Sequence, residues 1–390
     1  MFSKQDIKDI CALTPMQRGM LHHTLLEPDS HAYREQLILR LDGKIDTARL
    51  EEAWQTVINR HDALRGRFLS ERVSNPVQVI PHRETVTLAL HDIAAPAQTA
   101  GDDGLPAELE AYLACEQARG FDLANAHPMR LALFSADSDR HWLVWSFHHI
   151  LIDGWSIGLV LDEVLATYGG QAGAPAAGSY PQYLRWLAAR DSKAALTYWQ
   201  TALDGFSGDA LLPAAATPHA QAHVTSAIDA ATARRLRTLA QAQRASLHHL
   251  LLCAWGLTVG RQLDQCDVLV PTVLAGRPTD VADADKLVGL LINTVPMRVT
   301  WQDDDSFTAL LQKVRDHSLD ATQHQYVSMA DIQSATGKLP IDHVLLVQGM
   351  PGQEVLGSRC GDAAIGWAGF RESIPYALEV SLTPHDKGIG

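Results

Sequence analysis

The chain has 390 residues, and 32 Lys and Arg against 45 Asp and Glu give it a formal net charge of −13. Hydrophobic residues make up 46% of it and charged residues 20%, a globular composition that excludes wholesale disorder. The acidic balance argues against a general nucleic-acid-binding protein, because neutralising phosphates requires clustered Lys and Arg. The length predicts two to three domains, or two lobes that share one core.

Sequence features also bear on where the protein resides. No stretch approaches about 18 uninterrupted apolar residues, the length that a membrane span requires. Charges stand within the first six positions, where a secretory signal would be apolar. The five cysteines are scattered without the CxxC spacing of zinc sites, which indicates reduced thiols and no bound metal. These features predict a cytoplasmic protein that binds neither membrane nor metal.

The first half of the chain alternates predicted strands and helices. A helix is expected after Asp46, a candidate N-cap, because Leu50, Trp54 and Ile58 follow at helical spacing. Strands are predicted at residues 35–41, 77–80, 86–90, 131–134 and 142–147, and helices at 107–119 and from about 156. At residues 169–178, Gly, Ala and Pro replace the periodic pattern, which predicts a linker.

The second half repeats the alternation. Helices are predicted at residues 181–187, 192–202, 231–241, 247–263 and 306–318, and strands at 222–228, 266–273, 291–299 and 344–348. The pattern therefore predicts two α/β lobes, residues 1–172 and 173–390.

Residues 146–156 carry the most informative motif, where a predicted strand ends and a helix begins. His148 and His149 are adjacent on an extended backbone, so their side chains point to opposite faces. Asp153 could orient His149, cap the following helix or pair with a cation, and Gly154 allows a turn that other residues resist. Adjacent histidines are also common as buried, hydrogen-bonded groups, so the motif alone leaves a structural role open.

The string from His148 to Gly154 resembles the HHxxxDG signature of condensation domains of nonribosomal peptide synthetases. Their superfamily shares HxxxD with chloramphenicol acetyltransferase. Further segments resemble motifs of the same family in the expected order, so the resemblance runs from about residue 10 to about residue 385. These segments are residues 13–21, 60–68, 180–186, 289–299 and 324–328, the last with Ser328 in place of a proline.

The resemblance implies an α/β fold of two chloramphenicol-acetyltransferase-like lobes, arranged as a V-shaped pseudo-dimer with an active-site tunnel between them. Family members continue past residues 382–384 with another strand and a helix. We therefore expect that the second lobe lacks these elements, and that the natural protein is a longer synthetase with adenylation and carrier domains.

The resemblance also implies the chemistry. Condensation domains join a donor thioester to the amine of an acceptor, each tethered to a carrier protein by 4′-phosphopantetheine, and hold no tightly bound cofactor. The expected partners are an upstream donor carrier, a downstream acceptor carrier and an adenylation domain. A docking element for a separate upstream protein is expected near residues 4–9, and no nucleic-acid partner is expected.

Within the motif, His149 is the imidazole expected to act. It could accept a proton from the amine, hold the amine by a hydrogen bond, or donate to the oxyanion. His148 is expected to be structural. The resemblance pairs Asp153 with Arg277, and a buried carboxylate does require a partner.

The remaining motif residues are expected to support the site. Gly154 is expected to let the backbone approach the acyl chain, and Trp155 to pack. Ser156 is interpreted as a helix N-cap rather than a tunnel hydroxyl. Asn293 and Arg298 either brace the tunnel or serve strand packing and the surface.

Several residues favour one subtype. Gln17, Tyr33, Gln36 and residues 150–152 resemble the subgroup that accepts a donor residue of D configuration. An L-donor domain is the first alternative, and a starter domain that acylates from an acyl-coenzyme A is a second. A relative that has lost catalysis and serves for recruitment is the alternative from another functional class.

Overall fold

The computed structural model divides the chain into two compact units. It describes residues 5–71, 73–93, 104–171, 178–209, 222–337, 339, 341–349, 355–385 and 387–390. Unit 1 comprises Met1–Ala189, Arg277–Leu291 and Pro351–Pro375, and unit 2 comprises Arg190–Gly276, Ile292–Met350 and Tyr376–Gly390. The division differs from the expected boundary after residue 172, because two later segments return to unit 1. Most of the predicted linker, residues 172–177, lies outside the described residues.

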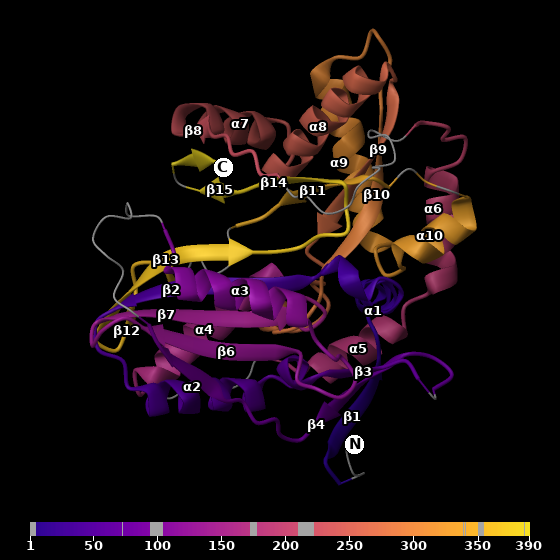
Figure 1. The fold of residues 1–390 in the computed structure, drawn as a ribbon. Coiled ribbons are helices and arrows are strands. Elements are labelled where there is room, and N and C mark those ends of the chain that lie inside the picture. The colour runs from indigo at the N-terminus through magenta and orange to yellow at the C-terminus, as the bar shows by residue number, and fades with distance from the viewer. Residues whose placement is uncertain are drawn as a thin grey trace. The chain divides into compact units, whose positions relative to one another are not determined.

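A six-stranded sheet organises unit 1, in the order β12-β13-β2-β7-β6-β5. These strands are Arg359–Cys360, Ala363–Arg371, Arg34–Asp42, Arg140–His148, Met129–Ser135 and Leu88–Asp92. The late strand β13 lies antiparallel beside β2, with Trp367 opposite Leu39 (Figure 1, yellow beside indigo). This pairing explains why a segment near the C-terminus belongs to unit 1.

Helices cover both faces of this sheet. Leu109 and Leu113 of α3 (Ala107–Arg119) pack on the face that carries Val144. Trp54 of α2 (Thr47–Arg60) meets Trp145 with ring centroids 4.9 Å apart. Since successive strand residues point to opposite faces, α2 and α3 lie on opposite sides of the sheet, and α4 (Gly154–Tyr168) packs beside α2.

A smaller sheet completes unit 1, in the order β1-β4-β3. Its strands are Ile7–Ala12, Val77–Pro81 and Arg67–Leu69. The helix α5 (Tyr180–Ala188) packs against β1, and Gln17 of α1 (Pro15–Leu26) accepts a hydrogen bond from Gln78 of β4 at 3.3 Å. Neither β1 nor α1 was expected from the sequence. The expected docking element overlaps β1, whose residues pair with β4, while residue 4 lies outside the described part of the chain.

Within the motif segment at residues 60–68, Arg65 is buried in unit 1. Arg65 is 1% exposed, and its guanidinium donates to the carbonyls of Pro81 at 3.0 Å and Ile58 at 2.9 Å. Its Nη2 lies 2.5 Å from Asp62 Oδ1. This arginine therefore ties a helix end to β4.

Unit 2 is built on a four-stranded sheet in the order β10-β9-β11-β14. Its strands are Asn293–Thr300, Asp267–Leu274, His343–Val347 and Leu378–Leu382. Its helices are α6 (Ser192–Ala202), α7 (Ala230–Ala242), α8 (Leu247–Leu263), α9 (Phe307–Gln323) and α10 (Met329–Thr336). A small sheet adds β15 (Pro384–His385), β16 (Gly388–Ile389) and β8 (Ile228–Asp229).

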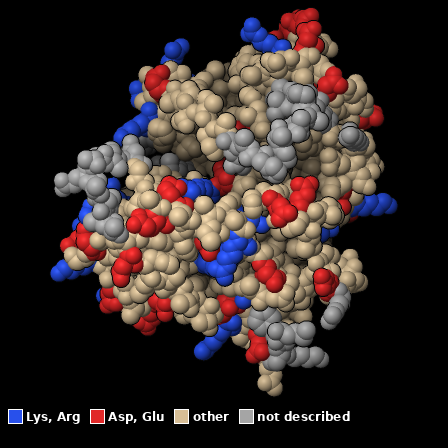
Figure 2. Space-filling view, viewed as in Figure 1, with Lys and Arg blue, Asp and Glu red and all other residues tan. Residues whose placement is uncertain are grey.

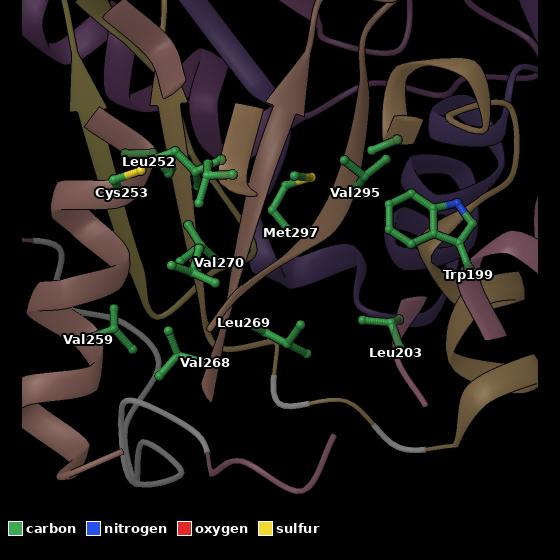
Figure 3. Packing of buried hydrophobic residues seen from close by; sticks show 14 of the residues in the cluster. Trp199, Leu203, Leu252, Cys253, Val259, Val268, Leu269, Val270, Val295 and Met297 are labelled. Atoms are coloured by element: carbon green, nitrogen blue, oxygen red, sulfur yellow. The ribbon is translucent and has the colours of Figure 1, made fainter. Parts of the chain in front are cut away.

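The core of unit 2 lies between α8 and the four-stranded sheet. Figure 3 shows Leu252 and Val259 of α8 beside Val268 and Val270 of β9, with Trp199 of α6 on the other side of the strands. At position 256, a Cβ would lie 2.8 Å from the Cγ1 atom of Val299. Only glycine lets the helix approach β10 this closely.

Several predicted helices agree with the structure residue for residue. The boundaries of α3, α6 and α8 match those expected from the sequence. The strand predicted at residues 222–228 is wrong, because only Ile228 and Asp229 pair with a neighbouring strand. Val224 is 94% exposed, so its apolar side chain has no core to enter.

The surface agrees with the mixed composition. On the face shown in Figure 2, Lys and Arg side chains are interspersed in small groups among Asp and Glu. None of the described helices combines the length and the apolar character needed to cross a membrane.

Candidate active site

The HHxxxDG segment forms the connection between β7 and α4 in unit 1. His148 is the last residue of β7, and Asp153 is the N-cap of α4. The backbone N–H of His149 donates to the carbonyl of Tyr33 at 2.8 Å. Because Tyr33 precedes β2, this bond holds the turn to the neighbouring strand of the same sheet.

The His149 ring is held through both nitrogens. Nδ1 lies 2.6 Å from the carbonyl oxygen of Ile152, so Nδ1 must carry the proton and donate. Nε2 lies 3.3 Å from Oε1 of Glu35 on β2. The His149 side chain is 22% exposed and the Glu35 side chain 4% exposed. The imidazole is thus the solvent-accessible member of the pair.

The surroundings of His149 favour its protonated form. Burial, the largest single influence, acts to lower the pKa of His149, but the Glu35 charge and the Ile152 hydrogen bond oppose it. The charge of Glu372 acts in the same direction as that of Glu35. The net effect raises the pKa of His149 above its ordinary value.

His148 has the opposite environment. It is 1% exposed, its Nδ1 accepts from the Ile150 N–H at 3.1 Å, and its Nε2 lies 3.2 Å from the Thr24 hydroxyl. Burial, reinforced by His149 and Arg34, lowers the pKa of His148 to about 3. A neutral ring with its proton on Nε2 fits these contacts. The ring is buried, and its purely structural role stays a prediction.

Asp153 is buried at 0% exposure and engaged through both oxygens. Its Oδ1 accepts from Arg277 Nη2 at 2.9 Å, from the backbone N–H of Ser156 at 2.9 Å and from the hydroxyl of Ser156 at 2.8 Å. Its Oδ2 accepts from the N–H of Leu291 at 3.1 Å. Asp153 therefore caps α4 and pairs with Arg277, two of the three roles that the sequence left open, and these contacts direct it away from His149.

Arg277 supplies the countercharge that a buried carboxylate needs. Its side chain is 8% exposed, and its Nη1 donates to the carbonyls of Ala284 and Leu287, both at 2.8 Å. The predicted Asp153–Arg277 pair is present. The segment Arg277–Leu291 belongs to unit 1 rather than to the later lobe in which the sequence placed it.

Two expectations for the turn are corrected. Ser156 is the third residue of α4 and not its N-cap, which is Asp153. The Ser156 hydroxyl is buried, accepts from the Gly289 N–H at 3.1 Å and lies 3.0 Å from the Gly289 carbonyl oxygen. Gly154 is the first residue of α4, and its φ is not positive. Its backbone conformation therefore does not require glycine. Its close approach to an acyl chain stays a prediction.

Trp155, expected to pack rather than to contact substrate, lies partly at the surface. It is 57% exposed, its indole N–H donates to the carbonyl of Asp285 at 2.8 Å, and the Arg277 guanidinium lies 5.4 Å from the ring centroid. The indole thus covers the outer side of the ion pair, a cation–π arrangement.

Asn293 and Arg298 belong to β10 of unit 2. Asn293 Nδ2 donates to the carbonyls of Gln325 at 2.6 Å and Val327 at 2.8 Å. Arg298 forms an ion pair with Asp267 at 2.7 Å. Both therefore brace unit 2, which favours the strand-packing interpretation. A role in a tunnel stays a prediction.

Glu35 is a site residue that the sequence motifs did not indicate. It was assigned only to a strand, although a carboxylate within an apolar strand is a signal worth following. Its relation to the motif depends on the register of β2 and β7, in which Arg34 lies opposite His148. Among the described residues, no group of three or more His, Cys, Asp or Glu side chains is placed to hold a metal ion.

Comparison with known proteins agrees with this geometry. The family model of the Condensation domain matches residues 7–390. Tyrocidine synthase 2 of Brevibacillus parabrevis is 30% identical over 401 residues, covering 99% of this chain and 11% of that protein. Bacitracin synthase 3 of Bacillus licheniformis is 32% identical over 357 residues, covering 88% and 6%. The chain thus spans a small part of these relatives.

Solved structures share the fold. The first condensation domain of the calcium-dependent antibiotic synthetase has a TM-score of 0.76 at 20% identity, with 98% of this chain and 90% of that chain covered. A four-domain nonribosomal peptide synthetase has a TM-score of 0.82 at 17% identity, with 100% and 31% covered. Condensation domains of such synthetases form amide bonds by acyl transfer. The family model, the similar synthetases and the HHxxxDG turn together show that this chain belongs to the condensation domain family.

Proposed function

We propose that this chain joins a donor aminoacyl or peptidyl thioester to the amine of an acceptor aminoacyl thioester, with each partner tethered to its own carrier protein. The observation that carries this proposal is the His149 ring. It is partly exposed and fixed through Nδ1, while Asp153 beside it is buried and occupied. One imidazole is therefore available to substrates, in a site whose other ionisable groups are engaged.

The proposed reaction needs one proton acceptor and one proton donor. The acceptor nitrogen attacks the thioester carbonyl, the C–N bond forms, the C–S bond breaks and the donor thiolate leaves. With Nδ1 donating to Ile152, the Nε2 lone pair of a neutral His149 can take the amine proton and return it to the sulfur. His149 can also act by holding the amine in place, because positioning two tethered reactants removes much of the entropic barrier. The phosphopantetheine arms arrive as parts of the two substrates.

We further propose a donor of D configuration, from the subtype resemblance alone. Gln17 and Gln36, two residues that suggest this subtype, are buried. Gln17 donates to the Ile150 carbonyl at 3.0 Å and Gln36 to the Leu113 carbonyl at 3.0 Å. They support the scaffold of the motif, so their bearing on stereochemistry is indirect.

The partners follow from the proposed reaction. They are an upstream donor carrier, a downstream acceptor carrier and an adenylation domain that loads the acceptor, with an upstream docking contact proposed near the N-terminus. All five cysteines are free thiols, which supports a reducing cytoplasmic setting.

The test is reconstitution with two loaded carriers. A donor carrier bearing a D- or L-aminoacyl group and an acceptor carrier bearing an L-aminoacyl group are mixed with the chain, and carrier-bound dipeptide is measured by intact-protein mass spectrometry. We expect dipeptide on the acceptor carrier, formed faster from the D donor. An L preference would overturn the subtype. Product from acyl-coenzyme A alone would support the starter alternative. Carrier binding without any product would support recruitment.

A further inference from the structure

Among the ion pairs of the described residues, His149 meets one carboxylate, that of Glu35. It is fixed by its strand, because β2 pairs with β7 from Arg34 opposite His148 to Asp42 opposite Arg140. Its side chain is 4% exposed. A buried carboxylate at such a position is costly unless it meets a positive or donating group, and the His149 ring is such a group.

The contact involves the nitrogen that the proposed reaction uses. Nδ1 is committed to the Ile152 carbonyl at 2.6 Å, so Nε2 is the atom that gains or loses a proton. Glu35 Oε1 lies 3.3 Å from Nε2. In the neutral ring this nitrogen carries a lone pair, whereas in the imidazolium it carries N–H and can donate to the carboxylate.

We propose that Glu35 is a positioning residue: it orients the His149 ring and provides the negative charge that stabilises His149 while Nε2 holds the proton of the acceptor amine. The proton moves from the amine nitrogen to Nε2, where Glu35 balances the new charge, and then to the departing thiolate. No other reactant is needed. This inference rests on the proposed function.

The other groups around the ring do not replace Glu35. Glu372, which follows β13, acts on the ring through its charge. His148, at the end of β7, is held neutral by burial, and the charge of Arg34 on β2 reinforces that neutrality. Among these groups, Glu35 combines a negative charge, burial and proximity to Nε2.

The decisive variant is Glu35→Gln, which keeps the size and removes the charge. The first readout is the titration of His149 in the isolated chain, followed by NMR of ¹⁵N-labelled histidine. The burial of the ring remains while the attraction is lost, so we expect the titration to move to lower pH. The second readout is the pH profile of kcat/KM with loaded carriers. We expect its acidic limb to move in the same direction and the maximal rate to fall roughly 10- to 100-fold, the range known for partners that orient metal-bound histidines.

Two further variants make the test specific. Glu35→Asp keeps the charge and should restore much of the shift in the titration. Glu27→Gln is the matched control, since Glu27 Oε2 lies 3.7 Å from His23 Nε2 but its side chain is 66% exposed. It should leave both readouts unchanged. If the titration and the profile of Glu35→Gln match those of the folded wild type, the inference is overturned.

The NMR readout separates this inference from the proposed function. A wild-type chain that makes no dipeptide while its His149 titration still depends on Glu35 would contradict the function and support the pair. If the wild-type chain makes dipeptide and the Glu35→Gln variant has the same pH profile of kcat/KM and the same His149 titration, only the role of Glu35 is contradicted.

Discussion

Asp153 and His149 lie four residues apart in one turn and have opposite environments. Asp153 is fully buried and accepts hydrogen bonds at both oxygens, including one from Arg277. His149 keeps 22% of its side chain exposed and meets a carboxylate through Nε2. One short motif therefore contains a buried brace and a partly exposed imidazole, the group that we propose acts in the reaction. We therefore expect replacements of Asp153 and His149 to have different consequences, one for stability and one for activity.

The difference shows how the turn holds its shape. Asp153 ties the start of α4 to the segment Arg277–Leu291 through Arg277 and the backbone of Leu291. Gly289 allows this close fit, since a Cβ there would lie 2.3 Å from Cε2 of Tyr180. With the backbone fixed in this way, the His149 ring needs only its contacts to Ile152 and Glu35 for its orientation.

The largest effect on stability is expected from Asp153→Ala. Removing one partner of a buried ion pair leaves the Arg277 charge uncompensated, which costs about 3–5 kcal/mol. The cap of α4 is lost as well. Urea unfolding should show this loss as a fall in the free energy of unfolding.

Asp137→Ala is the matched control for that variant. Asp137 also pairs with an arginine, Arg140, but the two side chains are 41% and 43% exposed. Exposed pairs contribute at most about 1 kcal/mol. An Asp153→Ala chain as stable as this control, yet inactive, would show that Asp153 acts in the chemistry and not as a brace.

A smaller loss is expected from Ser156→Ala, which tests the same brace without removing a charge. The hydroxyl contacts Asp153 and both the N–H and the carbonyl of Gly289. Leaving such buried groups without partners costs about 1–3 kcal/mol. Thermal unfolding should report this decrease, whereas Ser138→Ala, at an exposed hydroxyl, should change it little. Equal melting temperatures for the two variants would contradict the brace.

The smallest effect concerns pH and His148. Its folded pKa of about 3 lies below the unfolded value of about 6.5. Its contribution to stability is therefore present above pH 6.5 and is lost as the pH falls, at up to about 1.4 kcal/mol per pH unit. His149, with its raised pKa, acts in the opposite sense: its contribution is present at low pH and is lost as the pH rises through its folded pKa.

His148→Gln should isolate this contribution. Urea midpoints at pH 7 and pH 5 should show a smaller difference between the variant and the wild type at pH 5. The half-buried His127 and His248, whose pKa values desolvation lowers to about 4, remain in both chains. If the difference between the urea midpoints of the variant and the wild type is the same at both pH values, His148 is not held neutral in the folded chain.

Much of this contrast could be predicted from the sequence. Adjacent residues on an extended backbone face opposite ways, which predicted different environments for His148 and His149. In the structure His148 ends β7 and His149 begins the turn. The Asp153–Arg277 pair followed from a motif resemblance joined to the cost of a lone buried charge. The boundaries of the helices α3, α6 and α8 were also predicted correctly.

What the sequence could not predict depends on contacts between distant segments. Glu35 reaches His149 only because β2 and β7 pair in one particular register. The return of β13 to the unit 1 sheet is likewise a non-local pairing. The cap was assigned to Ser156 because Ser is a common N-cap residue, yet the cap lies three residues earlier, at Asp153.

The most direct test of whether the His149 imidazole acts in the proposed reaction is a single measurement on His149→Ala. Dipeptide formation from two loaded carriers is followed under single-turnover conditions, and the rate is expressed per folded molecule from the unfolding curve of the same sample. Replacing this partly exposed ring leaves the Asp153 network intact but removes the partner of the buried Glu35 carboxylate. We therefore predict a folded chain whose melting temperature falls less than that of Asp153→Ala. We also predict a rate about 10²- to 10⁴-fold lower, the usual contribution of an acid–base group. A folded His149→Ala chain that forms dipeptide at the wild-type rate would contradict the claim.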